Sequence, residues 1–261
     1  MTALIIAGFH RSGTSAVAQT LNRAGLFLGH DLLGSEPSNP HGHFEDNEVI
    51  EIHQALLDVN GVDWKATEPL DPFVPDAQWQ AIGDLVRRRN ALGEPWGFKD
   101  PRVCLFLPLW RHALPDARVL VVFRNPAETI RSLHMRHSRQ MVVNKGRGEV
   151  HRDFWRLRDL GARMWLTYHR ALLSSLPAPE HVHFVPFADR VAISSIATTL
   201  NERWGLGLHP EPNELDPDLG ATNVDPVRVT DHLLVEAIAE VWTELHRHAA
   251  NSAAVLNRSV S

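Results

Sequence analysis

The chain has 261 residues, 44% of them hydrophobic and 22% charged, which are the proportions of an ordinary globular protein with room for a full core. Its net charge of −5 at pH 7 argues against nucleic-acid binding by overall attraction to phosphate, and its single cysteine, Cys104, excludes an intrachain disulfide and a cysteine-based metal cluster. Because no apolar run reaches membrane-spanning length and the first residues lack the pattern of a signal peptide, we expect a soluble cytoplasmic protein.

The first third of the chain predicts one strand and then three helices. Residues 4–7 are apolar, and this run is long enough for a buried strand but too short for a buried helix. A long connection, residues 26–47, is rich in Gly, Pro, His and acidic residues, and loops of this length inside a domain are usually functional or disordered. Helices are predicted from about residue 13 to residue 25, from residue 47 to about residue 61, and over residues 76–92.

The remaining two thirds continue this alternation. The strongest strand signal is the apolar run at residues 117–123. A helix follows it directly, because Asn125 is a good N-cap, Pro126 is a favoured first helical residue, and Glu128 stands at the reciprocal position of a capping box. We also expect strands at residues 96–99 and 181–186, helices at 105–113, 150–176, 193–204 and 231–248, a mobile flap at 141–148, and a frayed end over the last dozen residues.

Strands that alternate with helices predict an α/β protein, here a three-layer fold with a central, mostly parallel sheet flanked by helices. We expect one domain over residues 1–261. Ligands of such sheets bind at the carboxyl ends of the strands, so the loops at residues 8–13, 99–102 and 124–126 should meet in one crevice. These loops predict a polyanion site in an acidic protein, since they carry four cations: Arg11, Lys99, Arg102 and Arg124.

The loop after the first strand has the outline of a P-loop, in which amides and a helix N-terminus bind an oxyanion. Gly8 and Gly13 have the spacing of the G-x-x-x-x-G-K-[ST] pattern, but Thr14 replaces the lysine that reaches the terminal phosphates of a nucleoside triphosphate. The cation of this loop is Arg11. The alternative is an ordinary strand–turn–helix with a chance pair of glycines.

The sequence GFHRSGTS at residues 8–15 resembles the 5′-phosphosulfate-binding loop of the sulfotransferases that use 3′-phosphoadenosine 5′-phosphosulfate (PAPS) as co-substrate. Bacterial members carry an R-S-G-T-[ST] core, and their usual proline before the basic residue is His10 here. The resemblance implies a P-loop-like fold. It also implies that the 5′-phosphosulfate is held by His10, Arg11, Ser12, Gly13, Thr14 and Ser15.

A second segment, residues 123–132, resembles the element with which this family holds the 3′-phosphate of PAPS: an arginine at a strand end and a serine eight residues later. Arg124 and Ser132 have that spacing, and Pro126 fits the R-[DN]-P start. A guanidinium together with a hydroxyl suits a phosphate dianion. The alternative is a strand-end arginine that pairs with a surface carboxylate, beside a serine without a role.

Two further segments resemble bacterial sulfotransferases and suggest the reacting groups. In the sequence KDPR at residues 99–102, Lys99 matches a family lysine that could neutralise the sulfuryl oxygens, while a structural ion pair is the alternative for Asp100 and Arg102. The sequence NPHGHFE at residues 39–45 resembles N-P-x-G-[YFH]-[FW]-E, and Glu45 is the expected general base. Runners-up are His43 and His53; alternatively Glu45 is only an early-turn acid of the next helix.

The remaining polar residues give weaker signals. Sixteen histidines are scattered, and the pairs His41-x-His43 and His246-x-His248 lack further ligands, so we expect no metal site. Residues 131–170 carry a charge of +7 while the rest of the chain carries −12. These cations either are solvated helix faces or line the entry for PAPS or an anionic acceptor.

The resemblance implies an enzyme that transfers a sulfuryl group from PAPS to a hydroxyl, or less readily an amine, of a small-molecule, sugar or lipid acceptor, leaving adenosine 3′,5′-bisphosphate. In this mechanism Arg11, Glu45, Lys99 and His43 are the candidate catalytic residues. The alternatives are a P-loop kinase of small molecules and an inactive PAPS-binding protein. We expect no nucleic-acid partner, no membrane span, and a monomer or homodimer.

Overall fold

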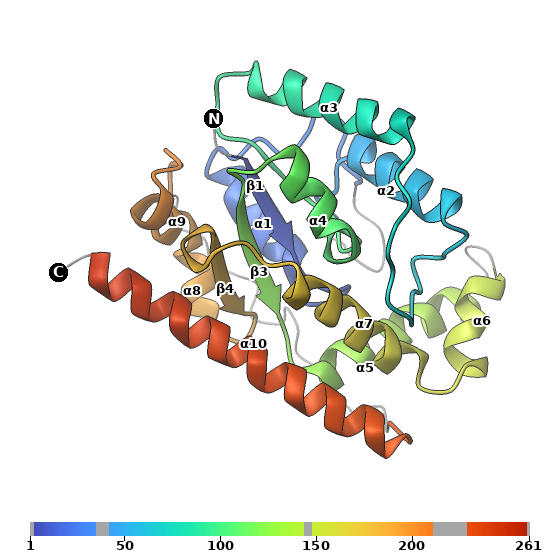
Figure 1. Cartoon of the computed structure of the whole chain (residues 1–261). Helices are drawn as coiled ribbons and strands as arrows, with labels where there is room; N and C mark the ends of the chain where they lie inside the picture. The colour runs from blue at the N-terminus through green and yellow to red at the C-terminus, as the bar shows by residue number, and fades with distance from the viewer. Residues whose placement is uncertain (1–2, 35–41, 144–147, 211–228, 260–261) are drawn as a thin grey trace.

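A computed structural model of the chain describes residues 3–34, 42–143, 148–210 and 229–259. Its centre is a sheet of four parallel strands in the order β2-β1-β3-β4 (Figure 1). The strands are β1 (Leu4–Ala7), β2 (Gly97–Lys99), β3 (Arg118–Phe123) and β4 (Val182–Pro186). The predicted three-layer α/β fold with a parallel sheet is confirmed, and each predicted strand is present within one residue of its expected start.

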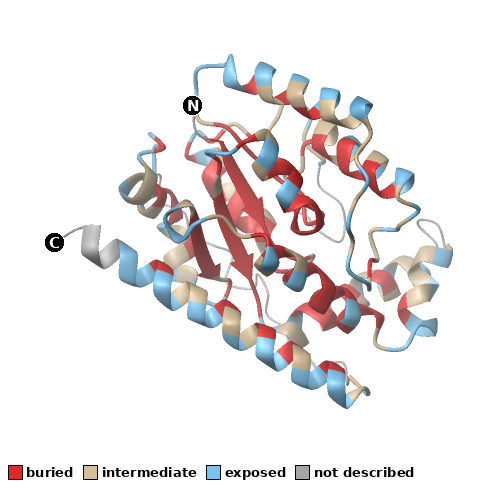
Figure 2. Cartoon of the chain, in the orientation of Figure 1, coloured by how far each residue is buried: buried red, intermediate tan, exposed pale blue. Residues whose placement is uncertain are grey.

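The helices cover both faces of this sheet, because alternate strand residues point to opposite sides. Ile5 and Val119 belong to one core, and Leu4 and Leu120 belong to the other. Almost every strand residue is buried, as Figure 2 shows in red. The helices are α1 (Thr14–Arg23), α2 (Asn47–Val59), α3 (Asp76–Asn90), α4 (Val103–Ala113), α5 (Pro126–Val142), α6 (Gly148–Arg156), α7 (Leu160–Ser174), α8 (Arg190–Ser194), α9 (Ile196–Trp204) and α10 (His232–Ser259).

The strand order places a topological switch beside β1. The chain passes from β1 to β2 on one side and then to β3 on the other side. In open α/β sheets, ligands bind at the carboxyl ends of the strands next to such a switch. The loop that follows β1 therefore occupies the position that the fold reserves for a ligand.

Three of the predicted helices differ from the structure: two are divided, and one ends later than expected. The single helix expected over residues 150–176 is two helices, α6 and α7, because Asp159 adopts a left-handed conformation (φ 56°) and its carboxylate accepts a hydrogen bond of 2.7 Å from the Thr230 hydroxyl. The helix expected over residues 193–204 is divided between α8 and α9. The terminal helix was expected to end near His248 but continues to Ser259.

Two predicted loops lie only partly in the described residues. The flap expected at residues 141–148 includes positions 144–147, which lie outside the described residues. Its first two residues belong to α5, which extends to Val142. Of the long connection after α1, the described parts return on themselves: Leu33 N donates to Glu45 O at 2.7 Å, and His43 N donates to Leu33 O at 3.2 Å. These two bonds fix the backbone on either side of Glu45.

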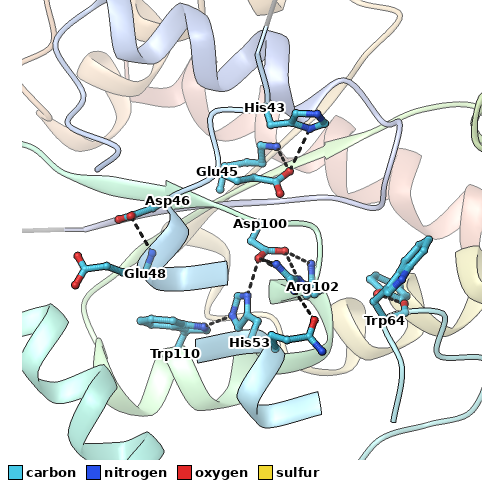
Figure 3. A network of polar contacts seen from close by, with 12 residues as sticks. His43, Glu45, Asp46, Glu48, His53, Trp64, Asp100, Arg102 and Trp110 are labelled. Atoms are coloured by element: carbon cyan, nitrogen blue, oxygen red, sulfur yellow. Dashed lines mark hydrogen bonds and ion pairs between the residues drawn. The ribbon is translucent and has the colours of Figure 1, made fainter. Parts of the chain in front are cut away.

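A buried polar cluster joins β2 to the helices around it (Figure 3). Asp100, directly after β2, accepts bonds of 3.0 Å and 2.6 Å from Arg102 and lies 3.1 Å from Nδ1 of His53 in α2. The indole of Trp110 in α4 donates to Nε2 of His53 at 2.8 Å. Since an indole can only donate, Nε2 of His53 accepts and its ring proton lies on Nδ1, facing the carboxylate.

The protonation states of this cluster follow from its surroundings. Burial would raise the pKa of the Asp100 carboxyl, but the contacts with His53 and Arg102 outweigh it and hold this pKa well below its usual range. Burial lowers the pKa of His53, so the imidazole is neutral. The cluster is therefore an ion pair of Asp100 and Arg102 that a neutral His53 orients, and it fixes α2 and α4 to the end of β2.

We predict that Gly97→Ala destabilises the sheet. A Cβ at Gly97 would lie 2.3 Å from the backbone oxygen of Leu4 in the neighbouring strand. Such overpacking costs about 1–3 kcal/mol, measurable by urea unfolding. Gly83→Ala in α3 is the matched control: its added methyl meets nothing within 4 Å, and a helical Gly→Ala change should gain about 0.5–1 kcal/mol. Equal stability of the two variants would contradict the close strand contact.

We predict that Asp100→Asn costs about 3–5 kcal/mol at pH 7, because it leaves a buried Arg102 without its counter-charge. The low folded pKa of Asp100 contributes stability that is present above the unfolded value of about 3.9 and is lost as the pH falls toward the folded value. Urea unfolding between pH 7 and pH 3 should therefore show a steeper acid loss in the wild type than in the variant. The exposed Asp116, changed to Asn, is the control, and parallel pH profiles of all three proteins would refute the role of Asp100.

Candidate functional site

The loop between β1 and α1 is shaped to expose amides. Gly13 has a φ of 90°, and a Cβ on it would lie 2.0 Å from the ring of Phe187. Arg11 also adopts a left-handed conformation, with φ 66°. Within the described residues no side-chain hydrogen bond caps α1, and the positive end of its dipole favours an anion at this position.

The predicted loop and the predicted arginine–serine element meet. Nε of Arg11 donates a hydrogen bond of 3.0 Å to Oγ of Ser132, 121 positions later in α5. Arg124, at the end of β3, lies over the ring of Phe187 at 5.5 Å, the same ring that borders Gly13. Both residues of the second element thus face the loop at residues 8–15.

Burial and neighbouring positive charges make the charged form of Arg11 less favourable than it is in water. Burial, followed by the charges of Arg136, Arg124 and Arg139, lowers the pKa of Arg11 to about 10. The guanidinium is still charged at neutral pH, and the three arginines that add to the effect of burial mean that further positive charge lies nearby. Arg124 donates to Glu128 at 2.9 Å, but that carboxylate is 48% exposed, and an exposed pair of this kind contributes at most about 1 kcal/mol.

Lys99 connects the loop to the predicted base. Its Nζ donates to Oε1 of Glu45 at 2.6 Å and to Oγ of Ser15 at 3.3 Å. Nδ1 of His43 lies 4.0 Å from the same oxygen of Glu45, and the two side chains face one another in Figure 3. Ser15 in turn donates to the backbone oxygen of His43 at 3.2 Å. Glu45, His43 and Lys99 therefore form one group against the helix end that carries Ser15.

The histidines of the site differ in what they can do. Burial, helped by Arg136 and Lys99, lowers the pKa of His43 to about 4, so its ring is neutral at pH 7 and can accept a proton or a hydrogen bond. His53 is fully buried, and both of its nitrogens face protein groups, Asp100 and Trp110. The geometry thus gives His53 a structural position rather than access to a substrate.

Two polar atoms inside the loop lack partners among the described residues: Oγ of Ser12 and Nε2 of His10. Burial lowers the pKa of His10 to about 3, which keeps it neutral. Its ring meets Trp64 edge-on at 5.0 Å and Tyr168 at 5.6 Å. A buried polar atom without a partner costs free energy, and here both lie in the loop that the fold offers to a ligand.

Three of the four predicted cations, Arg11, Lys99 and Arg124, lie in or beside the loop at residues 8–15. The fourth, Arg102, is held by Asp100 on the α2 side and is neutralised there. The position of Arg102 after a strand end predicts a place beside the loop, but its partner Asp100, only two residues away, holds it on the other side.

Some residues near the loop are not among the candidate site residues named from the sequence. Arg136 lies one helical turn after Ser132, so the i, i+4 spacing could have indicated it. Phe187 follows β4 directly, and the rule that strand ends meet applies to it as well as to the other loops. Trp64 lies between two predicted helices, and only the folded structure places it beside His10.

The solved structures to which this chain is similar are described as sulfotransferases. One of them is the sulfotransferase domain of an olefin synthase from Synechococcus PCC 7002, with 18% identity, a TM-score of 0.47, and coverage of 93% of this chain and 94% of that one. Another is a sulfotransferase from Alicyclobacillus acidocaldarius, with 15% identity, a TM-score of 0.43, and coverage of 98% of this chain and 96% of that one. Sulfotransferase STF1 of Mycobacterium tuberculosis H37Rv is also similar, with 13% identity, a TM-score of 0.40, and coverage of 97% of this chain and 76% of that one.

No curated protein matches the chain in sequence. Among the described residues, no helix is both long and apolar enough to cross a bilayer. The model of the sulfotransferase family, in contrast, matches residues 3–194, which include both elements of the crevice and the segment that carries Glu45 and Lys99. This match spans well over half of the sequence, and the chain belongs to the sulfotransferase family.

Proposed function

We propose that this protein transfers the sulfuryl group of PAPS to a hydroxyl of a small-molecule, sugar or lipid acceptor. The observation that carries the proposal is the 3.0 Å hydrogen bond from Arg11 to Ser132. It joins the loop suited to the 5′-phosphosulfate to the helix suited to the 3′-phosphate. The two ends of a single donor molecule thus have adjacent binding elements.

The residues present fit such a donor. The N-terminal end of α1 can offer amides to the phosphosulfate, and the Ser12 hydroxyl, which has no partner among the described residues, can add a hydrogen bond. Arg124 and Ser132 hold the 3′-phosphate, and the weak exposed pair of Arg124 with Glu128 can be exchanged for a dianion. A sulfuryl group carries less charge than a γ-phosphoryl group, which is consistent with Thr14 in place of the P-loop lysine.

The acceptor side is built around Glu45. Its carboxylate accepts the proton of the acceptor hydroxyl while that oxygen forms a bond to sulfur. The bond between sulfur and the bridging phosphate oxygen breaks, and adenosine 3′,5′-bisphosphate leaves with the electron pair. Arg11 and Lys99 stabilise the charge that develops on the bridging and sulfuryl oxygens. The neutral His43, 4.0 Å from Glu45, is the second candidate for the proton acceptor.

We predict that the protein binds adenosine 3′,5′-bisphosphate without a divalent metal and more tightly than it binds ATP with magnesium. Arg124→Ala should weaken this binding about 10–100-fold, because it removes a charge-assisted contact to the 3′-phosphate. Isothermal titration calorimetry measures the affinity for each nucleotide. The control is Arg87→Ala, which changes an exposed arginine of α3. Preferred, magnesium-dependent binding of ATP would favour a small-molecule kinase instead.

We predict that Glu45→Gln lowers sulfuryl transfer about 100–10,000-fold and leaves binding of adenosine 3′,5′-bisphosphate intact, because the amide cannot take the proton. Transfer of ³⁵S from labelled PAPS into a metabolite extract measures the rate. Glu51→Gln, on the exposed face of α2, is the matched control. Normal turnover of Glu45→Gln would mean that Glu45 is not the general base and would favour His43. If the wild type binds the bisphosphate but transfers no sulfuryl group, the protein is an inactive binding protein.

A further inference from the structure

A second group of cationic side chains lies at the end of the sheet opposite the crevice. Arg118 is the first residue of β3, and Arg124 follows its last residue, so the two arginines are about 20 Å apart by the rise of the strand. Arg203 is in α9 and contacts the start of β4. The proposed reaction involves neither Arg118 nor Arg203.

The strand pairing places Arg118 and His183 on one face of the sheet. Leu120 of β3 pairs with His183 of β4, and Arg118 is two residues before Leu120, so alternation directs all three to the same side. This side carries the core of Leu120 and Val185, against which α9 packs. The guanidinium of Arg118 does not extend freely into solvent, because its Nε and Nη1 are buried.

Arg203 reaches the same end of β4 from α9. Its Nη2 donates to the backbone oxygens of Pro179 and Val182 at 2.8 Å and 2.9 Å. Val182 directly precedes His183, and the ring of Trp204, the residue after Arg203, meets the His183 ring edge-on at 6.5 Å. These contacts hold the Arg203 side chain beside His183.

All three side chains keep buried nitrogens without a hydrogen-bond partner in the part of the chain that the structure describes. These atoms are Nε and Nη1 of Arg118, Nε of Arg203 and Nδ1 of His183. His183 is only 5% exposed, whereas both arginines are half-buried, so a small ion in solution can reach the group. Buried polar atoms without partners cost free energy, and four of them at one end of two strands indicate a missing ligand.

The positive charge of this group is also left without a close counter-charge. Among the described residues neither Arg118 nor Arg203 forms an ion pair, and Glu180, whose charge raises the pKa of Arg203, is exposed. Burial and then the charge of Arg118 lower that pKa. Burial and then Arg203 lower the pKa of His183 to about 4, so its ring is neutral at pH 7 and its Nδ1 can donate in one tautomer.

The chemistry of the donors selects the kind of ligand. Guanidinium groups bind oxyanions through charge-assisted hydrogen bonds, and an anion between two of them removes their mutual repulsion. Here the donors come from two strands and one helix. Donors from three elements suit the oxygens of a tetrahedral ion better than the two coplanar oxygens of a carboxylate.

We propose that Arg118, His183 and Arg203 bind a small tetrahedral oxyanion, inorganic phosphate or sulfate, at the amino ends of β3 and β4. This site is separated from the crevice by the length of β3 and does not depend on the sulfotransfer function. The bound ion neutralises the two arginines and connects β3, β4 and α9.

The test uses the full chain with ¹⁵N-labelled histidines and follows the Nδ1 signal of His183 by NMR, which His183→Asn identifies. Phosphate, sulfate and acetate are added separately at an ionic strength kept constant with chloride. We expect phosphate, sulfate or both to shift this signal with half-saturation near about 1 mM, the affinity of a few charge-assisted hydrogen bonds. A response to one ion alone identifies the ligand.

The variants separate this site from the rest of the protein. Arg118→Gln should weaken the response about tenfold, and Arg118→Lys, which keeps the charge, should weaken it less. The exposed Arg156→Gln of α6 is the matched control, and Arg124→Ala removes a cation of the crevice; both should leave the response within about twofold of the wild type. Thermal unfolding shows that each variant is folded before it is titrated.

Four outcomes would overturn the proposal. If neither phosphate nor sulfate moves the His183 signal, water alone meets these nitrogens. An equal response to acetate means a general attraction of anions rather than a site for a tetrahedral ion. A response that Arg118→Gln leaves unchanged means that Arg118 does not contact the ion, and a response that Arg124→Ala abolishes means that the ion binds in the crevice instead.

Discussion

The central position of β1 is the constraint on which the site depends. This strand is fully buried and pairs in parallel with β2 on one side and β3 on the other. Parallel pairing brings the carboxyl ends of the three strands to one edge, so the loop after β1 lies between Lys99 at the end of β2 and Arg124 at the end of β3. If β1 stood at an edge of the sheet, only one of these two strand ends could adjoin the loop.

The charges around this loop are balanced in pairs of unequal strength. Asp100 and Arg102 are buried, doubly hydrogen-bonded and joined to two helices, so they form a permanent part of the core. Lys99 and Glu45 are also largely buried but touch Ser15 and His43, which border the crevice. Arg124 and Glu128 are the most exposed pair. The order of burial separates a pair that holds the fold from an exposed pair that the proposed donor can displace.

The sequence was informative where the signal is local. The strands at residues 4–7 and 117–123, the N-cap of α5 at Asn125 and the spacing of Arg124 and Ser132 depend on neighbours within one element, and the structure contains all of them. Local patterns could not predict the break between α6 and α7, because Asp159 leaves the helix to bind Thr230, 71 positions away. The contact of Lys99 with Glu45 and the place of Trp64 beside His10 also arise only from tertiary packing.

Helix α2 carries the residue that follows Glu45 and is fastened at two points. Asp46 caps its first turn and is paired with the buried Arg89 of α3, while His53 is locked between Asp100 and Trp110. Because Glu45 directly precedes a helix that is fixed in this way, its carboxylate has little freedom to move. In the proposed reaction, a differently shaped acceptor would then have to be accommodated by residues other than Glu45, because the position of this residue is tied to a helix that is fixed to the end of β2.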